Sequence, residues 1–193
     1  LDMLAFISQP SEAAAYQFRP ESENDAIDVS RLWQKKRRNQ LGELRKKHIG
    51  YVMQTGGLLP YLTVRENMGL SRSVLGLRGD DTVENLAREL GIARHLDKLP
   101  DTLSVGERQR VAIGRALSHD PSIVIADEPT ASVDPFAAEK IMSLFIGLAE
   151  ERNITVVVAS HAWRHIKRLD LRRLAHHTQR SKDGKTTETV VNG

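Results

Sequence analysis

The chain has 193 residues, a formal net charge of +3 at pH 7 and 40% hydrophobic residues, which is the composition of a globular domain large enough to bury a core. It contains no cysteine, which excludes disulfides and thiolate metal sites. No apolar run approaches the ~20 residues that cross a bilayer, and no secretory signal pattern is present. A net charge this small does not indicate the strong positive field that attracts nucleic acid.

The first quarter of the chain predicts a helix, two strands and a second, basic helix. The first helix is an apolar segment from Leu1 to Ser8, and short strands follow at 14–18 and 26–29. The basic helix runs from about 31 to 48. Its lysine and arginine side chains could touch anionic lipid headgroups or nucleic acid. We favour a solvated helix face, because runs of charge usually mean only that.

The middle of the chain predicts one strand and then a helical region. The strand covers 48–53, and residues from about 63 to 117 have a mainly helical pattern. This pattern is broken at 76–80 and around Pro100.

The second half predicts a parallel βαβ unit. Residues 122–126 form an unbroken apolar strand, and Asp134 with Pro135 is a good start for a helix that reaches about Arg152. A second apolar strand follows at 154–159. Strands this hydrophobic, joined through a helix, are typical of a parallel sheet, so the fold class is α/β.

Two adjacent carboxylates, Asp127 and Glu128, follow the first of these strands, and His161 follows the second. The carboxyl ends of parallel strands form the sheet edge at which open α/β folds hold ligands. Hard acidic oxygens suit Mg²⁺ rather than zinc. The alternatives are a helix cap or solvated turn for the acidic pair and an ordinary surface residue for the histidine.

A second candidate site is Ser104-Val105-Gly106-Glu107, before the amphipathic pattern that continues to Leu117. Ser-x-x-Glu is a capping box, which by itself would explain the segment. The same geometry provides free N–H groups, a hydroxyl and a glycine that permits close approach. It is therefore also a ready anion site.

Together these segments resemble the ATPases of the ATP-binding cassette (ABC) family. Leu103 to Arg110 resembles the signature motif, although Val105 and Glu107 depart from the common Leu-Ser-Gly-Gly-Gln. The strand that ends in Asp127 and Glu128 resembles the Walker B motif. The segment that follows it resembles the D-loop, which is Ala131, Ser132, Val133 and Asp134.

Two further segments carry the resemblance. Gln54, with Leu58 to Met68 after it, resembles the Q-loop and the surface on which a transmembrane subunit docks. His161 resembles the switch histidine. Within the family, the segment after Gln54 and the short helical insert are similar to the exporter-side and lipoprotein-release ATPases.

The resemblance implies a P-loop NTPase (RecA-like) parallel-sheet core with an inserted helical subdomain. Residues 1–193 would form a single partial cassette, with the core at 1–54 and 118–193 and the helical signature subdomain at 55–117. The sequence has no G-x-x-x-x-G-K-[ST] phosphate loop in the required setting. We therefore interpret the chain as a cassette incomplete at its N-terminus, cut just after that loop.

The segment Gly184-Lys185-Thr186 only superficially resembles a phosphate loop, because Gln179 stands where the first glycine should be and no apolar strand precedes it. A polar turn at Asp183-Gly184 between two strands is the better interpretation.

The resemblance also assigns roles and cofactors, which are ATP and Mg²⁺. Asp127 would hold the metal through water, with Gln54 as a further metal contact, and Glu128 would polarise the attacking water. His161 would contact the γ-phosphate. The signature residues Ser104, Val105, Gly106 and Glu107 would reach the nucleotide of a second subunit, and the D-loop would link the two sites.

The implied partners are a transmembrane permease, docked near Gln54 to Met68, and a second ATPase subunit, with no nucleic acid. The location would be peripheral, on the cytoplasmic face of the membrane. Without the phosphate loop, the printed residues are expected to neither bind nor hydrolyse ATP appreciably. A cassette remnant that only docks a partner, or a non-transport ABC ATPase, is the alternative function.

Overall fold

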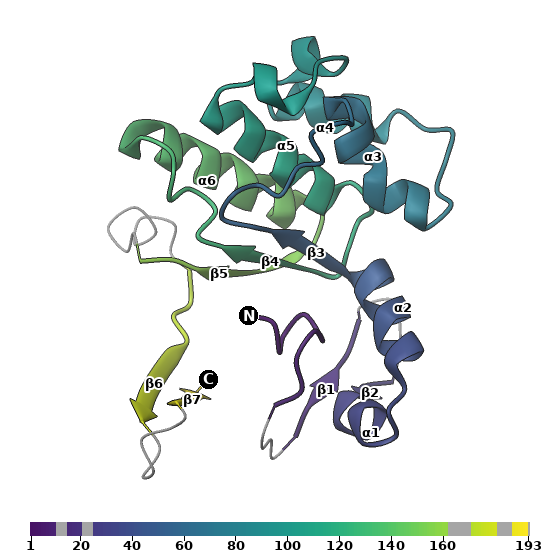
Figure 1. The fold of residues 1–193 in the computed structure, drawn as a ribbon, viewed down its shortest axis with the longest axis vertical. Helices are drawn as coiled ribbons and strands as arrows, with labels where there is room; N and C mark the ends of the chain where they lie inside the picture. Colours follow the sequence, from purple (N-terminus) through teal and green to yellow (C-terminus); the bar gives the residue numbers. More distant parts are fainter. Residues whose placement is uncertain (11–14, 21–24, 162–170, 181–186, 193) are drawn as a thin grey trace. The chain divides into compact units, whose positions relative to one another are not determined.

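The computed structural model describes the chain except for residues 11–14, 21–24, 162–170, 181–186 and 193. The chain divides into two compact units, Leu1–Ala162 and Trp163–Gly193, and each is described by itself (Figure 1).

The first residues form a series of turns, so the predicted helix from Leu1 to Ser8 is wrong. One helical hydrogen bond forms, from the Ala5 N–H to the Leu1 carbonyl at 3.0 Å. Phe6 then has a φ of 56°, which a right-handed helix cannot contain. The buried Phe6 side chain instead packs in a core cluster with Val29 and Leu41.

The next elements are the antiparallel pair β1 (Gln17–Phe18) and β2 (Ile27–Asp28), then helices α1 (Val29–Gln34) and α2 (Arg38–His48). Both strands were expected, but only these short parts of 14–18 and 26–29 pair. Asp28 caps α1, because its carboxylate accepts a hydrogen bond from the Arg31 N–H at 3.0 Å.

The single basic helix predicted from 31 to 48 is wrong, because the chain breaks between α1 and α2. Lys36 has a left-handed φ of 52°. The Lys36 N–H donates to the Trp33 carbonyl and the Arg37 N–H donates to the Leu32 carbonyl, both at 2.9 Å. This is the Schellman pattern that ends a helix. Like charges in sequence from Lys35 to Arg38 also disfavour a continuous helix there.

A three-stranded parallel sheet of β3 (Ile49–Val52), β4 (Ile123–Asp127) and β5 (Thr155–Ala159) lies at the centre of the first unit, in the order β3-β4-β5. The strand pairs are parallel, as predicted for β4 and β5, and Asp127 lies opposite Ala159. Since all three strands run the same way, the residues after them emerge at one edge of the sheet.

The helices of this unit are α3 (Val64–Val74), α4 (Thr82–Glu89), the 3₁₀ turns η1 (Ala93–His95) and η2 (Pro100–Thr102), α5 (Val105–Leu117) and α6 (Pro135–Glu151). Figure 1 shows α5 and α6 on one face of the sheet, with α3 and α4 beyond α5. The predicted break at 76–80 is confirmed. In α6, Ile141, Phe145 and Leu148 are buried, as their helical spacing predicted.

The second unit contains β6 (Ala175–Arg180) and β7 (Thr187–Asn192), which pair as antiparallel strands. Two strands were expected here, but the proposed turn at Asp183-Gly184 lies outside the described residues. Among the helices that the structure describes, none is both long enough and apolar enough to span a bilayer.

We expect the stability of the fold to depend on pH because of His119, which lies between α5 and β4. Burial lowers the pKa of its ring to about 4, and the charges of Arg72 and His48 add to this effect. The unfolded chain, with a pKa near 6.5, therefore binds a proton first. We expect the free energy of unfolding to be highest above pH 6.5 and to fall by on the order of 3 kcal/mol as the pH drops to about 4.

Chemical denaturation of wild type and of His119→Gln between pH 4 and 7 tests this prediction. The pH slope should become shallower in the variant. His161→Gln is the control, because it removes a histidine whose ring is fully exposed rather than buried. An equal slope for wild type and His119→Gln would contradict a neutral, buried ring at position 119.

Candidate functional site

Glu128 occupies a strained position at the carboxyl edge of the sheet. It follows β4 with a left-handed φ of 44°, a conformation that costs a residue with a side chain on the order of 1 kcal/mol or more. Its N–H donates to the Ala159 carbonyl of β5 at 2.8 Å. Its carboxylate accepts hydrogen bonds from the Ser160 hydroxyl at 3.1 Å and from the His161 N–H at 2.6 Å. Two adjacent strands thus fix both the backbone and the carboxylate of Glu128.

Asp127 and His161 lie at the same edge. Asp127 is the half-buried last residue of β4. The pKa of Tyr51, on the neighbouring strand β3, is raised by burial and then by the charges of Asp2 and Asp127. The exposed His161 ring lies with its Nε2 3.8 Å from Glu128 Oε1. The structure therefore brings Asp127, Glu128 and His161 together, as the strand pattern predicted.

Gln54 lies in the exposed turn that follows β3. The Gly56 N–H closes this turn by donating to the Met53 carbonyl at 2.8 Å. No hydrogen bond joins Gln54 to Asp127 or Glu128 in the structure. Gln54 thus shares the edge at which β3 ends without a hydrogen bond to the acidic pair.

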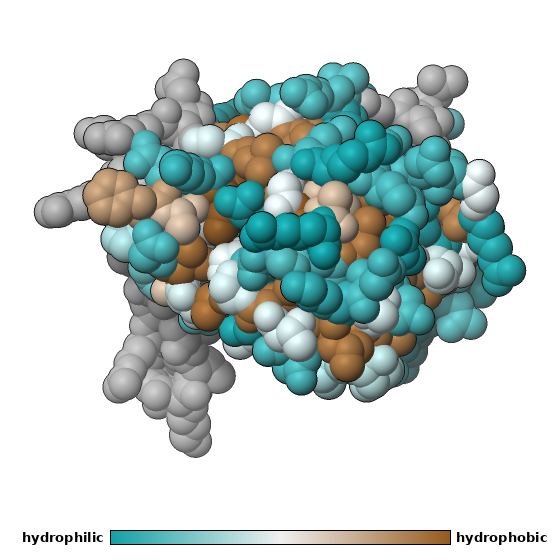
Figure 2. All heavy atoms as spheres, turned by 90° about the horizontal axis from the view of Figure 1, so that it is seen from above, coloured by the Kyte–Doolittle hydropathy of each residue, from teal (hydrophilic) through white to brown (hydrophobic). Residues whose placement is uncertain are grey.

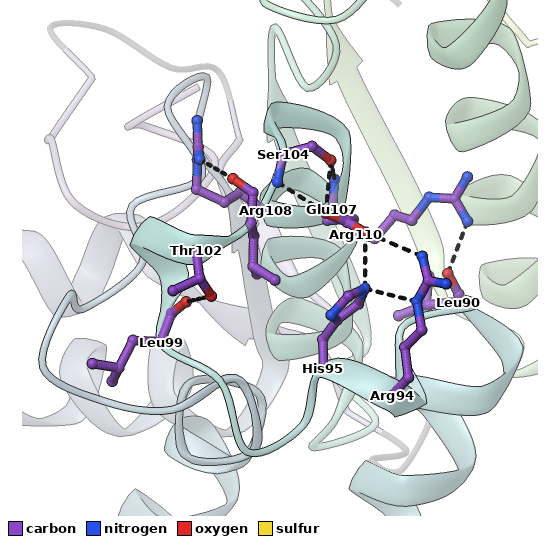
Figure 3. Close-up of polar contacts among 10 residues, drawn as sticks. Leu90, Arg94, His95, Leu99, Thr102, Ser104, Glu107, Arg108 and Arg110 are labelled. Carbon is purple, nitrogen blue, oxygen red and sulfur yellow. Dashed lines mark hydrogen bonds and ion pairs between the residues drawn. The ribbon is translucent and has the colours of Figure 1, made fainter.

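Ser104 caps α5, and the capping box predicted from the sequence is confirmed (Figure 3). The Glu107 N–H donates to the Ser104 hydroxyl oxygen at 3.3 Å. In return, Glu107 Oε2 accepts from the Ser104 N–H at 2.9 Å and from its hydroxyl at 2.8 Å. Val105 and Gly106 occupy the first turn between them, and 41% of the Val105 surface is exposed.

The Glu107 carboxylate is held ionised. Hydrogen bonds from the Ser104 backbone and hydroxyl lower its pKa to about 2, and His95 adds to the effect. The other oxygen, Oε1, lies 2.8 Å from Nε2 of the buried His95 and 3.6 Å from the Arg94 guanidinium (Figure 3). Sequence reasoning assigned no role to His95, because a 3₁₀ turn and an extended loop, not helical spacing, bring it to Glu107.

The D-loop segment lies beside the start of α5. A Cβ built on Gly106 would come 3.9 Å from Val133 and 3.7 Å from Ile141 of α6, which are ordinary contacts. Asp134 caps α6, because its Oδ1 accepts from the Phe136 N–H at 3.1 Å and from the Ala137 N–H at 3.0 Å. Ala131 and Ser132 are exposed. The segments 104–107 and 131–134 therefore lie next to each other.

The sequence matches a profile described as "ABC transporter" over residues 14–131. The lipoprotein-releasing system ATP-binding protein LolD of Legionella pneumophila (strain Lens) is 38% identical over 141 residues, which are 72% of this chain and 62% of that protein. The bacitracin export ATP-binding protein BceA of Halalkalibacterium halodurans is 36% identical over 140 residues, 71% of this chain and 54% of that protein. The chain thus spans about six tenths of the length of its LolD relative.

A solved structure supports the same grouping. The dimeric post-hydrolysis state of the ATP-binding cassette MJ0796, bound to ADP and Pi, matches with a TM-score of 0.67 and 30% identity over 85% of this chain and 69% of that chain. The α/β fold with a parallel sheet, predicted from the sequence, is therefore that of a P-loop NTPase cassette. Since the family profile covers more than half of the chain, the chain belongs to the ABC transporter family, and its fold is that of the family's ATP-binding cassette.

Proposed function

We propose that this chain is an ATP-binding and ATP-hydrolysing subunit of an ABC transporter, which powers transport through a partner transmembrane subunit. The observation that carries the proposal is the edge formed by Asp127, Glu128 and His161, where Glu128 is held in a strained turn by two strands. Residues held in a strained backbone conformation cluster at active sites, and Glu128 is such a residue.

The residues of this edge suit hydrolysis of a phosphoric anhydride. Glu128 would orient and polarise the attacking water, and His161 would approach the γ-phosphate from the end of β5. Mg²⁺ in such sites keeps several waters and takes few protein ligands beyond the nucleotide, so the carboxylate of Asp127, acting through water, fits it. Gln54 would reach the metal from the turn after β3. A bound ion would neutralise the negative charge that develops on the phosphate, and the residues of this edge would position the reacting groups.

The start of α5 would serve the nucleotide of a second subunit. The Glu107 N–H is already used by Ser104, so the donors left for an anion are the N–H groups of Val105 and Gly106. Packing within the chain does not require glycine at 106, because an added Cβ would meet only ordinary contacts. This supports close approach of a ligand as the reason for the residue. The D-loop, from Ala131 to Asp134, would then link the two sites.

The proposed permease surface is the segment from Gln54 to Met68. In it, 72% of the Tyr61 surface is exposed, and Met53, which directly precedes it, has 47% of its surface exposed. Figure 2 shows hydrophobic side chains reaching the surface between hydrophilic ones on the upper face. Exposed aromatic side chains are favoured in interface cores. We place the protein peripherally on the cytoplasmic face of a membrane and expect no nucleic-acid partner.

We also propose the division of the cassette into a core of residues 1–54 and 118–193 and a helical signature subdomain of residues 55–117. The compact grouping of α3, α4 and α5 supports the subdomain. The C-terminal end of α5, however, packs against β3, so this helix is shared by both parts.

The test of the proposal compares residues 1–193 with the protein as its natural source makes it. We expect residues 1–193 alone to neither bind nor hydrolyse ATP appreciably, because a phosphate loop normally supplies the backbone cradle and lysine for the β- and γ-phosphates. The natural protein should release phosphate from ATP in a Mg²⁺-dependent manner. Equilibrium nucleotide binding and phosphate release measure both.

Two outcomes would change the proposal. Mg²⁺-dependent hydrolysis by residues 1–193, lost in Glu128→Gln, would show that the phosphate loop is dispensable. A natural protein that docks a permease but hydrolyses no ATP would favour a non-catalytic cassette that acts only as a docking module.

A further inference from the structure

The start of α5 already holds one negative charge, the carboxylate of Glu107. Hydrogen bonds from the Ser104 backbone and hydroxyl lower its pKa to about 2, so it is ionised at neutral pH. Its Oε2 accepts from that hydroxyl at 2.8 Å. A phosphate oxygen bound by the Ser104 hydroxyl would therefore lie within two hydrogen-bond lengths, roughly 5.5 Å, of Oε2. Two negative charges at this distance repel each other, so a phosphate bound here needs a positive charge nearby.

The Ser104 hydroxyl has no proton free for a phosphate while Glu107 accepts it. A hydroxyl has one proton and two lone pairs. The proton goes to Glu107 Oε2, and the oxygen accepts from the Glu107 N–H at 3.3 Å. If the hydroxyl turns to donate to a phosphate, Oε2 keeps only the hydrogen bond from the Ser104 N–H at 2.9 Å. The carboxylate thus loses a donor at the moment when a second anion arrives.

His95 is the titratable side chain placed to supply the positive charge. Its Nε2 lies 2.8 Å from Glu107 Oε1, and only 8% of its side chain is exposed (Figure 3). Arg94 also lies 3.6 Å from Oε1, but 79% of that side chain is exposed, so water screens its charge. Arg94 Nε lies 3.0 Å from His95 Nε2 as well. Among the described residues, Arg94 and Glu107 are the charged groups in polar contact with the His95 ring.

The surroundings of the His95 ring act on its charge in opposite directions. Its Nδ1 is buried without a hydrogen-bond partner in the described part of the chain, so a proton there has no acceptor. This burial and the charge of Arg94 disfavour the protonated ring, whereas Glu107 favours it. One more negative charge beside Glu107 shifts this balance towards the protonated ring. A phosphate at Ser104 is such a charge.

We propose that His95 is a positioning residue that takes up a proton when the start of α5 engages the nucleotide of a second subunit, and so balances the charge of Glu107. The inference rests on the proposed function, in which Ser104 serves that nucleotide. The proton comes from water and binds Nδ1, and it returns to water when the nucleotide leaves. The charged ring holds Glu107 through Oε1, which frees the Ser104 hydroxyl to donate to the phosphate. Nucleotide engagement therefore weakens as the pH rises.

NMR titration of the His95 ring in the natural protein, without nucleotide, tests the pair by itself. We expect the ring to release its proton about one pH unit lower in Glu107→Gln than in wild type, because glutamine fills a capping box without a charge. Glu150→Gln is the matched control, since it removes an exposed carboxylate on α6. Equal midpoints in wild type and Glu107→Gln would overturn the proposal.

The pH dependence of the KM for ATP separates charge balance from mere stability. We expect His95→Gln to raise KM about fivefold or more near pH 6 and little near pH 8, with kcat almost unchanged. His95→Lys carries a fixed charge and should keep a low KM at both values. Titration of ATP itself is common to all variants, so the ratio of each KM to that of wild type reports position 95. A ratio for His95→Gln that is the same at both pH values would overturn the proposal.

The double variant shows whether His95 acts through Glu107. In a Glu107→Gln background, His95→Gln should no longer change KM, because no carboxylate remains to be balanced. An undiminished effect there would mean that the ring only stabilises its loop, which would overturn the proposal. A wild type without hydrolysis would count against the proposed function, while the titration of the ring still decides whether His95 and Glu107 are coupled.

Discussion

Replacing Glu128 with glutamine is expected to lower ATP hydrolysis by the natural protein at least about 100-fold, because an amide cannot polarise the attacking water as a carboxylate does. Glutamine has nearly the same shape. Its carbonyl oxygen can replace Oε1, which accepts from the His161 N–H, and its amide N–H can donate to the Ser160 hydroxyl, which now donates to Oε2. ATP binding should therefore persist, and the loss should appear in kcat rather than in KM.

Steady-state phosphate release and equilibrium ATP binding measure this effect. Glu150→Gln is the matched control, since Glu150 is exposed on α6 and the same change of charge should leave both quantities unaltered. Thermal unfolding of the two variants checks that the fold is intact. A decrease in kcat of less than about tenfold in Glu128→Gln would show that Glu128 is not the residue that orients the attacking water. That result would favour the alternative in which the cassette only docks a partner.

Local patterns of the sequence were sufficient for the central part of the fold. The β4 strand, its parallel pairing with β5 and the α6 helix rest on unbroken apolar runs, the Asp134 cap and helical spacing, all of which act within a few residues. The same holds for the capping box of Ser104 and Glu107. Placement of Asp127, Glu128 and His161 at one edge then follows from the direction of parallel strands alone.

Contacts between distant segments could not be read in this way. Arg115 reaches Gly56 and Gly57 across more than fifty residues, and the signal in the sequence was only a glycine pair after a strand. His95 meets Glu107 through a loop that has no periodicity. The break at Lys36 was missed for a different reason. A left-handed lysine carries no residue-type signal, whereas a glycine there would have indicated the helix end.

Gly50 is the position at which a single added methyl group should destabilise the fold most. A Cβ there would lie 2.3 Å from the Ala116 carbonyl oxygen, 3.0 Å from its carbon and 2.9 Å from a Val124 methyl group. Because two of these atoms belong to the backbone of α5, the helix itself would have to move away from β3. We expect Gly50→Ala to lower the free energy of unfolding by about 3 kcal/mol or more.

Chemical denaturation of Gly50→Ala beside Gly147→Ala measures the effect. Gly147 lies within α6 with nothing within 4 Å of an added Cβ, so alanine there should stabilise the helix by up to about 1 kcal/mol. Unchanged stability in Gly50→Ala would mean that α5 does not press on β3. Since Ala116 follows Arg115, a displaced α5 should also loosen the hold on Gly56 and Gly57. Faster amide exchange from Gln54 to Gly57, in the turn that follows β3, is therefore expected in Gly50→Ala and not in Gly147→Ala, because Arg115 of α5 donates hydrogen bonds to this turn.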